Sequence, residues 1–241
     1  MMRLELFSYR FADAVLEHSF PHEYRDVLEV LSAAPVPLLD PAKAPGKGGV
    51  KRRDRGPRKG DLGPRYLFLP VDQVALNRYL DGEFTAEKRA WEHHPLVVEG
   101  EGGPQTGLKA DYKKNRVQVE VQFGNMARWY TDVFKFQLAY AQDAIDAAVL
   151  VVPTQRFANL IDENVAYFER VRRELPWAKM SLTLPILVLG IEPTDFAAAR
   201  SCYDAAAATF AAAQKAAGKL IVPVPFAERV VEEPSEEGEE T

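Results

Sequence analysis

The clearest alternation of apolar and polar residues along the chain lies between positions 116 and 123. Its apolar members are Val117, Val119, Val121 and Phe123, and its polar members are Gln118, Glu120 and Gln122. A period of two is typical of a β-strand with two different faces. The polar Lys-Lys-Asn run at 113–115 favours a turn. We therefore expect a β-hairpin in which Asp111 ends the first strand and is folded back towards Glu120.

Two carboxylates placed side by side in this way suit a hard divalent cation such as Mg²⁺. That ion takes carboxylate oxygens from one or two residues and leaves further positions for substrate oxygens. Gln122 falls on the same face as Glu120, two residues further along the strand. The simpler interpretation of the same residues is an edge hairpin with a solvated polar face.

Longer patterns predict an α/β fold with a mixed central β-sheet flanked by helices. The nearly continuous apolar runs at 145–152 and 184–190 indicate strands that are buried on both faces. Shorter strands are expected at 96–98 and 108–111, a short apolar run occupies 66–70, and a polar loop is expected at 154–164. Helical spacing of apolar residues predicts helices at 11–18, 22–33, 71–80, 85–91, 126–141, 165–174 and 196–218. In the helix at 126–141 we expect a basic and aromatic surface formed by Arg128, Trp129, Tyr130 and Lys135, with core packing as the alternative role of the two aromatic residues.

The length of 241 residues fits one sizeable domain. We expect that domain over 1–226, with a basic loop inserted at 43–65 and an acidic disordered tail at 227–241. The single cysteine, Cys202, excludes an internal disulfide framework and fits a reducing interior. The sequence has no apolar run of about 18 residues and no signal-peptide pattern, so a cytoplasmic protein is expected.

The formal net charge of −5 is unevenly distributed. The tail from 228 onwards has seven Glu and one Arg, a net of −6, so the remaining 227 residues sum to +1. Segment 43–65 has nine Lys or Arg and two Asp, a net of +7. Its central cations are Arg52, Arg53, Arg55, Arg58 and Lys59. The segment is either a solvated mobile loop or an arm that binds the phosphate backbone of DNA.

The spacing Asp111-x8-Glu120-x-Gln122 resembles the metal site of the PD-(D/E)XK nucleases, with Gln122 where most members have Lys. The run Glu120-Val-Gln-Phe-Gly-Asn125 is similar to that of the BglII and BstYI group of type II restriction endonucleases. The resemblance continues at Pro185-Ile-Leu-Val-Leu-Gly190 and loosely covers most of residues 10–195.

This resemblance implies a restriction-endonuclease-like fold and Mg²⁺-dependent hydrolysis of double-stranded DNA that leaves 5′-phosphate ends. It implies Asp111, Glu120 and the carbonyl of Val121 as metal ligands, with Gln122 beside them. The family has an Asn near the active site at about the position of His94, and here the sequence departs from the pattern. His94 is either a proton acceptor in catalysis or part of an ordinary loop His pair.

The resemblance also implies a homodimer in which each subunit reads half of a palindromic site. Candidate DNA-binding residues are Asn125 and Arg128 at the start of a helix, and Arg156 and Asn159 in the loop that follows a central strand. A DNA methyltransferase would act in the same cell as a functional partner. The alternatives are a DNA-binding protein that keeps the fold without cutting, and a repair or structure-selective nuclease.

Overall fold

The chain forms two compact units in a computed structural model. One comprises Met1–Pro37 with Asp72–Asp195, and the other comprises Leu38–Val71 with Phe196–Thr241. The residues that the structure describes are 1–39, 50–52, 65–97, 107–162, 164–178, 181–218, 222–223 and 226.

The single domain expected over 1–226 stays a prediction. Most of the basic loop 43–65 and the whole tail 227–241 lie outside the described residues. Within the described part of the chain, none of the helices is both long enough and apolar enough to cross a membrane.

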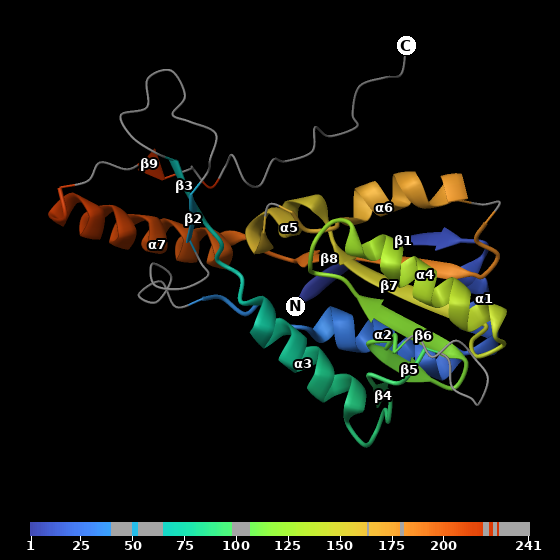
Figure 1. The fold of residues 1–241 in the computed structure, drawn as a ribbon. Coiled ribbons are helices and arrows are strands. Elements are labelled where there is room, and N and C mark those ends of the chain that lie inside the picture. The colour runs from blue at the N-terminus through green and yellow to red at the C-terminus, as the bar shows by residue number, and fades with distance from the viewer. Residues whose placement is uncertain are drawn as a thin grey trace, which may run out of the picture. The chain divides into compact units, whose positions relative to one another are not determined.

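The larger unit is organised around a six-stranded sheet with the order β1-β8-β7-β6-β5-β4 (Figure 1). Its strands are β1 (Met2–Tyr9), β4 (Glu92–His93), β5 (Tyr112–Lys114), β6 (Val117–Val121), β7 (Ala147–Pro153) and β8 (Ile186–Pro193). β6, β7 and β8 are parallel, whereas β1, β5 and β4 are antiparallel to their neighbours. The sheet is therefore mixed, as expected. Every residue of β7 and β8 is buried, which explains their continuous apolar sequence.

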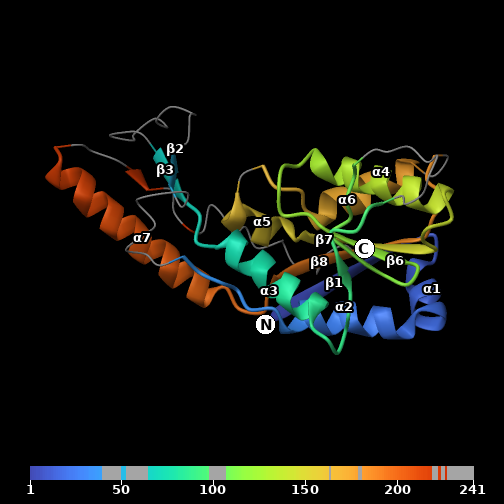
Figure 2. The same cartoon turned by 60° about the horizontal axis from the view of Figure 1, so that its bottom comes forward.

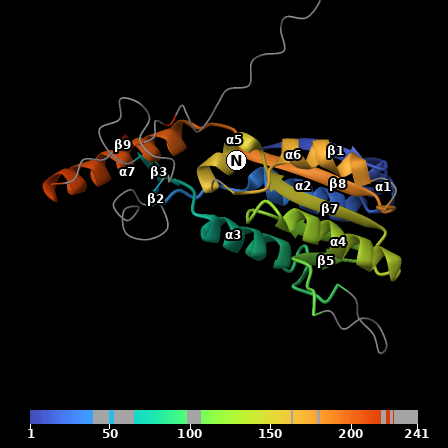
Figure 3. The ribbon, with the colours of Figure 1, turned by 45° about the horizontal axis from the view of Figure 1, so that its top comes forward.

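Helices cover both faces of this sheet (Figure 2). α4 (Arg128–Ala141) and α6 (Phe168–Glu174) cover one face, and α1 (Ala12–Ser19) and α2 (Pro21–Ala33) cover the other. α4 connects β6 to β7, while α5 (Gln155–Ile161), α6 and the 3-10 helix η1 (Leu175–Ala178) connect β7 to β8. α4 and α6 lie next to each other above the strands (Figure 3). Their shared core includes Trp129, Val133, Phe136, Phe168, Val171, Ala148, Leu150 and Val188.

The sequence patterns missed the first strand. β1 pairs with β8 along its whole length, from Met2 opposite Pro193 to Tyr9 opposite Ile186. Its polar residues fall on both sides of the chain, and Leu6 is exposed, because β1 is an edge strand of the sheet. A half-exposed edge strand does not produce the apolar run or the strict alternation that identifies an inner strand.

Several predicted boundaries between residues 71 and 111 were wrong. The helix expected to end at residue 80 continues through Asp81 and Gly82 as α3 (Gln73–Thr85), because Leu76, Leu80 and Phe84 bury one face at intervals of four residues. The expected second helix at 85–91 is a turn. Of the strands expected at 96–98 and 108–111, residue 98 lies outside the described residues, and the described part shows a bridge between Leu96 and Lys109.

The expected loop at 154–164 contains α5. Thr154 caps this helix because its side chain accepts a hydrogen bond from the N–H of Phe157 at 3.4 Å. The helix buries four side chains, which are Phe157, Ala158, Leu160 and Ile161. The polar residues of this segment therefore lie on the outer face of a short packed helix.

The smaller unit combines helix α7 (Ala197–Ala216) with a three-stranded sheet of β2 (Val50–Arg52), β3 (Arg65–Phe68) and β9 (Val222–Pro223). Phe68 packs edge-on against Tyr203 and Phe210 of α7, with ring centroids 5.6 Å apart in both pairs. The helix continues through Cys202, whose buried thiol donates a hydrogen bond to the carbonyl of Leu39 at 3.1 Å.

Candidate active site

A hairpin is present at the predicted place and is formed by β5 and β6, but its bounds differ from the prediction. Lys113 and Lys114 of the expected turn belong to β5, and Asp111 precedes that strand where the sequence predicted it to end one. Tyr112 lies opposite Val119, and Lys114 lies opposite Val117, so Asn115 and Arg116 form a two-residue turn. Asn115 has a φ of 51°, a left-handed conformation that Asn tolerates better than most residues. Arg116 fixes the turn by an ion pair to Asp146 at 2.5 Å. This register brings Asp111 and Glu120 to the same place, as the sequence predicted.

The polar face of β6 is not solvated. Gln118 and Glu120 are each 1% exposed, and Gln122 is 8% exposed. The Glu120 carboxylate accepts a hydrogen bond from the side-chain amide of Gln118 at 2.8 Å. Asp111 accepts one from the backbone N–H of Val121 at 2.7 Å. The interpretation as a solvated edge hairpin is therefore wrong, because helix α4 covers this face.

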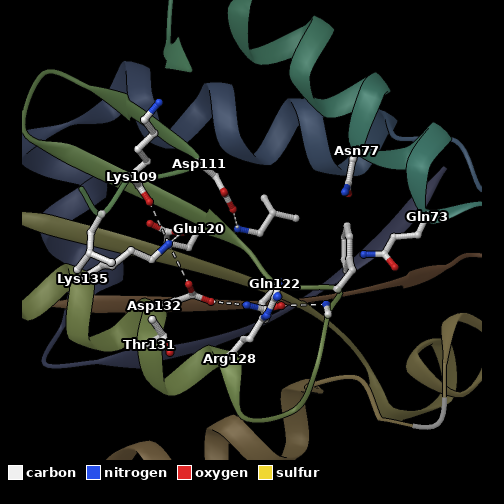
Figure 4. Close-up of a pocket in the computed structure, with 14 residues that line it drawn as sticks. Gln73, Asn77, Lys109, Asp111, Glu120, Gln122, Arg128, Thr131, Asp132 and Lys135 are labelled. Carbon is white, nitrogen blue, oxygen red and sulfur yellow. Dashed lines mark hydrogen bonds and ion pairs between the residues drawn. The ribbon is translucent and has the colours of Figure 1, made fainter. Parts of the chain in front are cut away.

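Helix α4 contributes two charged residues that complete the cluster (Figure 4). The Lys135 ammonium forms ion pairs with Glu120 and with Asp132, the latter at 3.0 Å. Asp132 in turn accepts a hydrogen bond from the Gln122 amide at 2.7 Å. The expectation that Lys135 lies at the helix surface was wrong. Its side chain is buried because it can pair with two carboxylates beneath the helix.

Burial and mutual repulsion perturb both predicted metal ligands. Burial raises the pKa of Glu120 from its ordinary 4.5 to about 8, and the nearby charge of Asp111 adds to this. The Lys135 ammonium opposes the shift without cancelling it. Burial also raises the pKa of Asp111. The hydrogen bond from the Val121 N–H lowers that pKa, but by less than burial raises it. Because the charge of Asp111 contributes to the raised pKa of Glu120, the two carboxyl groups lie within electrostatic reach of each other.

The raised pKa of Glu120 predicts how stability depends on pH in a buffer that contains a chelator. In the folded protein Glu120 retains a proton that the unfolded chain releases near pH 4.5. The retained proton stabilises the folded state fully below pH 4.5, and this stabilisation is lost as the pH rises towards about 8. Urea denaturation across this range should show the decline in the parent and a weaker decline in Glu120→Gln. An equal decline in both would contradict the assignment.

The carboxylates open into a cavity of about 400 Å³. Its lining includes Asp111, Glu120, Val121, Gln122, Gly124, Arg128, Asp132 and Lys135, and on the opposite side Gln73 and Asn77 of α3 (Figure 4). Sequence reasoning missed the last two residues, which lie more than thirty positions before Asp111. No local pattern marks them, because it is the packing of α3 beside the sheet that brings them to the site.

His94 stands beside this cavity and is not one of the residues that line it. Its ring stacks on His93 at 3.8 Å, and its backbone N–H donates to the carbonyl of Asp111 at 3.1 Å. A positive charge on His94 would lower the pKa of Asp111, although this is the smallest of the influences on that group. A catalytic role for His94 stays a prediction.

The candidate DNA-binding residues occupy several places. Arg128 is exposed and lines the cavity, and the Asn125 side chain accepts a hydrogen bond from the N–H of Ala127 at 2.9 Å just before α4 begins. Arg156 and Asn159 are half-buried on α5. Arg52 belongs to β2, and the other basic candidates, which are Arg53, Arg55, Arg58 and Lys59, lie outside the described residues.

The donor set fits a hard divalent cation. Asp111 and Glu120 supply carboxylate oxygens, and Val121 borders the same cavity. Among the described residues, no cluster of three or more His, Cys, Asp or Glu has a metal-binding arrangement. Two protein carboxylates with open positions are what Mg²⁺ uses when substrate oxygens complete its coordination.

Comparisons with known proteins identify the family and the fold of the chain. The chain matches the family described as Restriction endonuclease BglII/BglIII over residues 4–191. It resembles the crystal structure of restriction endonuclease BglII complexed with a DNA 16-mer, with a TM-score of 0.57 and 18% identity over 78% of this chain and 75% of that one.

The crystal structure of free BglII gives a TM-score of 0.52 and 17% identity, covering 81% of each chain. No curated protein sequence matches the chain. At these identities the structural likeness shows the fold, and the family match over most of the chain shows the relationship. The chain belongs to the BglII/BglIII restriction endonuclease family and is a type II site-specific deoxyribonuclease.

Proposed function

We propose that this chain cleaves double-stranded DNA at a short palindromic site by Mg²⁺-dependent phosphodiester hydrolysis, leaving 5′-phosphate ends. The observation that carries the proposal is the buried pair Asp111 and Glu120, which opens into a cavity large enough for a phosphodiester. The enzyme would act as a homodimer in the cytoplasm, beside a methyltransferase that protects the same site.

Mg²⁺ held by Asp111, Glu120 and the carbonyl of Val121 would polarise the scissile phosphate and stabilise charge on the leaving oxygen. The protein fixes these ligands before the metal binds. The backbone N–H of Val121 orients Asp111, and the Gln118 amide orients one oxygen of Glu120. Prearranged ligands of this kind lower the cost of reorganisation when the substrate arrives.

Gln122 acts in this proposal as a positioning residue. Its NH₂ group donates to Asp132 at 2.7 Å, and its carbonyl oxygen accepts from the N–H of Gly124 at 2.9 Å. Both ends of the amide are therefore engaged, and Gln122 connects the end of β6 to α4. Its second NH₂ hydrogen is the part of the side chain that can still orient a water molecule or a phosphate oxygen.

Binding to the DNA backbone would come from the cations at the mouth of the site and from segment 43–65. Arg128 begins α4 and lines the cavity of the carboxylates, Asn125 lies just before that helix, and Arg156 and Asn159 lie on α5. Phosphate contacts by Arg and Lys give affinity that weakens steeply with salt, whereas base contacts in the grooves give specificity. We assign the basic segment, including Arg52, Arg53, Arg55, Arg58 and Lys59, to the first role.

A patch of exposed aromatic residues beside α4 and α6 supports the homodimer. Tyr130 is 48% exposed, Phe134 58% and Trp177 87%. Tyr130 and Phe134 are one turn apart on α4, and the Tyr130 hydroxyl donates to Glu174, three residues before Trp177. Aromatic residues of this size are enriched in the buried centre of protein interfaces.

A digestion experiment tests the function. Purified protein incubated with phage DNA and Mg²⁺ should produce discrete bands, and sequencing of the ends should give a palindromic site with 5′-phosphates. A smear would support a structure-selective or nonspecific nuclease. Unchanged DNA that shifts on a gel would support a DNA-binding protein that does not cut.

A further inference from the structure

The ammonium group of Lys135 is surrounded by three oxygens. They are Oε2 of Glu120, Oδ1 of Asp132 at 3.0 Å and the backbone carbonyl oxygen of Lys109 at 3.2 Å. The Lys135 side chain is only 11% exposed, so these partners take the place of most of its water. Figure 4 shows the ammonium between the end of the Lys109 segment, β6 and α4.

Two carboxylates and one backbone carbonyl are ligands that a hard divalent cation prefers. A Lys ammonium is a compact positive charge with three donors, and here each donor has one acceptor. Nζ therefore occupies the centre of a set of oxygens that resembles a metal site. We call the set formed by Glu120, Asp132 and the Lys109 carbonyl the Lys135 cage.

Glu120 takes part in two sites at once. One of its oxygens belongs to the Lys135 cage, and its carboxyl group also lines the same cavity as Asp111. In two-metal nuclease sites the two cations lie about 3.5–4 Å apart, so a shared carboxylate can contact both. Glu120 is the carboxylate that two neighbouring cations could share here. The Lys135 ammonium lies between Glu120 and Asp132, and Asp111 is the other acidic residue near Glu120.

We propose that Lys135 is a resident cation that occupies the position of a second metal ion, so that the active centre binds one divalent ion at Asp111 and Glu120. This inference rests on the proposed function of the same cavity. The ammonium is kept in place because Asp132 is itself held by Gln122. A fixed positive charge in a buried site can stabilise charge that develops on a phosphate without any reorganisation.

The stoichiometry of Mn²⁺ binding tests this proposal without DNA and without activity. Mn²⁺ is titrated into the whole protein and the free ion is followed by electron paramagnetic resonance; soaked crystals give the positions by anomalous scattering. The parent should bind one ion. Lys135→Ala empties the cage and should bind a second ion, located between Glu120 and Asp132. The double variant Lys135→Ala/Asp132→Asn lacks a cage carboxylate and should bind one.

Lys109→Met is the matched control, because it removes another lysine of the same cavity while leaving the backbone carbonyl of the cage. It should bind one ion, as the parent does. A single ion in Lys135→Ala, or two ions in the parent, would overturn the inference. Should Lys135→Ala be unfolded in metal-free buffer, Mn²⁺ must restore its circular dichroism, and a chain that stays unfolded in saturating Mn²⁺ also overturns it.

The two proposals fail in different ways. A parent protein that binds one Mn²⁺ ion and never cleaves DNA removes the proposed function and leaves the role of Lys135 standing. A parent that cleaves DNA, together with a Lys135→Ala variant that binds one ion, removes only the role of Lys135.

Discussion

Replacing Asp111 or Glu120 with alanine is expected to reduce the rate of DNA cleavage by about 10³-fold or more, since a bound metal contributes several kcal/mol to the transition state. Each carboxylate supplies an oxygen to the same proposed ion, so the loss of either should have nearly the full effect. Single-turnover cleavage of a plasmid with one site measures the rate.

The variants must still fold and bind DNA for this result to be interpreted. Gel-shift affinity in a chelator should be retained, because neither carboxyl group is among the residues proposed to bind the DNA backbone. Glu17→Ala is the control, since Glu17 is an exposed acid of α1 outside the cavity, and it should cleave at the parent rate. Cleavage by Asp111→Ala at the parent rate would place the active centre elsewhere in the chain.

The second large effect concerns stability and comes from the contact between Phe168 and Gly190. A methyl group at Gly190 would lie 2.6 Å from Cγ of Phe168, which is too close for any carbon contact. Gly190→Ala should therefore cost about 1–3 kcal/mol as an overpacked core. Phe168 is 1% exposed, so Phe168→Ala should cost about 3–5 kcal/mol through the cavity it leaves.

Combining the two changes separates a direct contact from general damage. The double variant should lose less stability than the sum of the single variants, because the new methyl occupies space that the ring vacated. Free energies of unfolding in urea give the coupling. Gly82→Ala provides the control, because no atom lies within 4 Å of the added carbon in α3, and replacing this helical glycine should stabilise by about 0.5–1 kcal/mol. If the losses in free energy of unfolding at positions 168 and 190 simply add in the double variant, α6 accommodates the Gly190→Ala methyl group by moving away from β8.

The sequence alone determined the parts of the fold and site that depend on local order. The alternation in β6 identified that strand and its two faces, and the polar run at 113–115 indicated the chain reversal that brings Asp111 to Glu120. The exact two-residue turn came from the structure, because Lys113 and Lys114 belong to β5. The continuous apolar runs identified β7 and β8 because strands buried on both faces need no polar residues. These features depend on residues within about ten positions of one another, so the pattern of apolar and polar residues along the sequence predicts them.

The tertiary structure decided which polar residues are buried and what they contact. Arg128, Asp132 and Lys135 share one face of α4 at intervals of four and three residues, a signal that the sequence did contain. Helical spacing shows that residues share a face, but it does not show what that face packs against. Only the packing of α4 over β6 makes Lys135 a partner of Glu120, and only the position of α3 brings Gln73 and Asn77 to the cavity. Contacts of this kind depend on how distant elements pack together, and a linear pattern does not encode that.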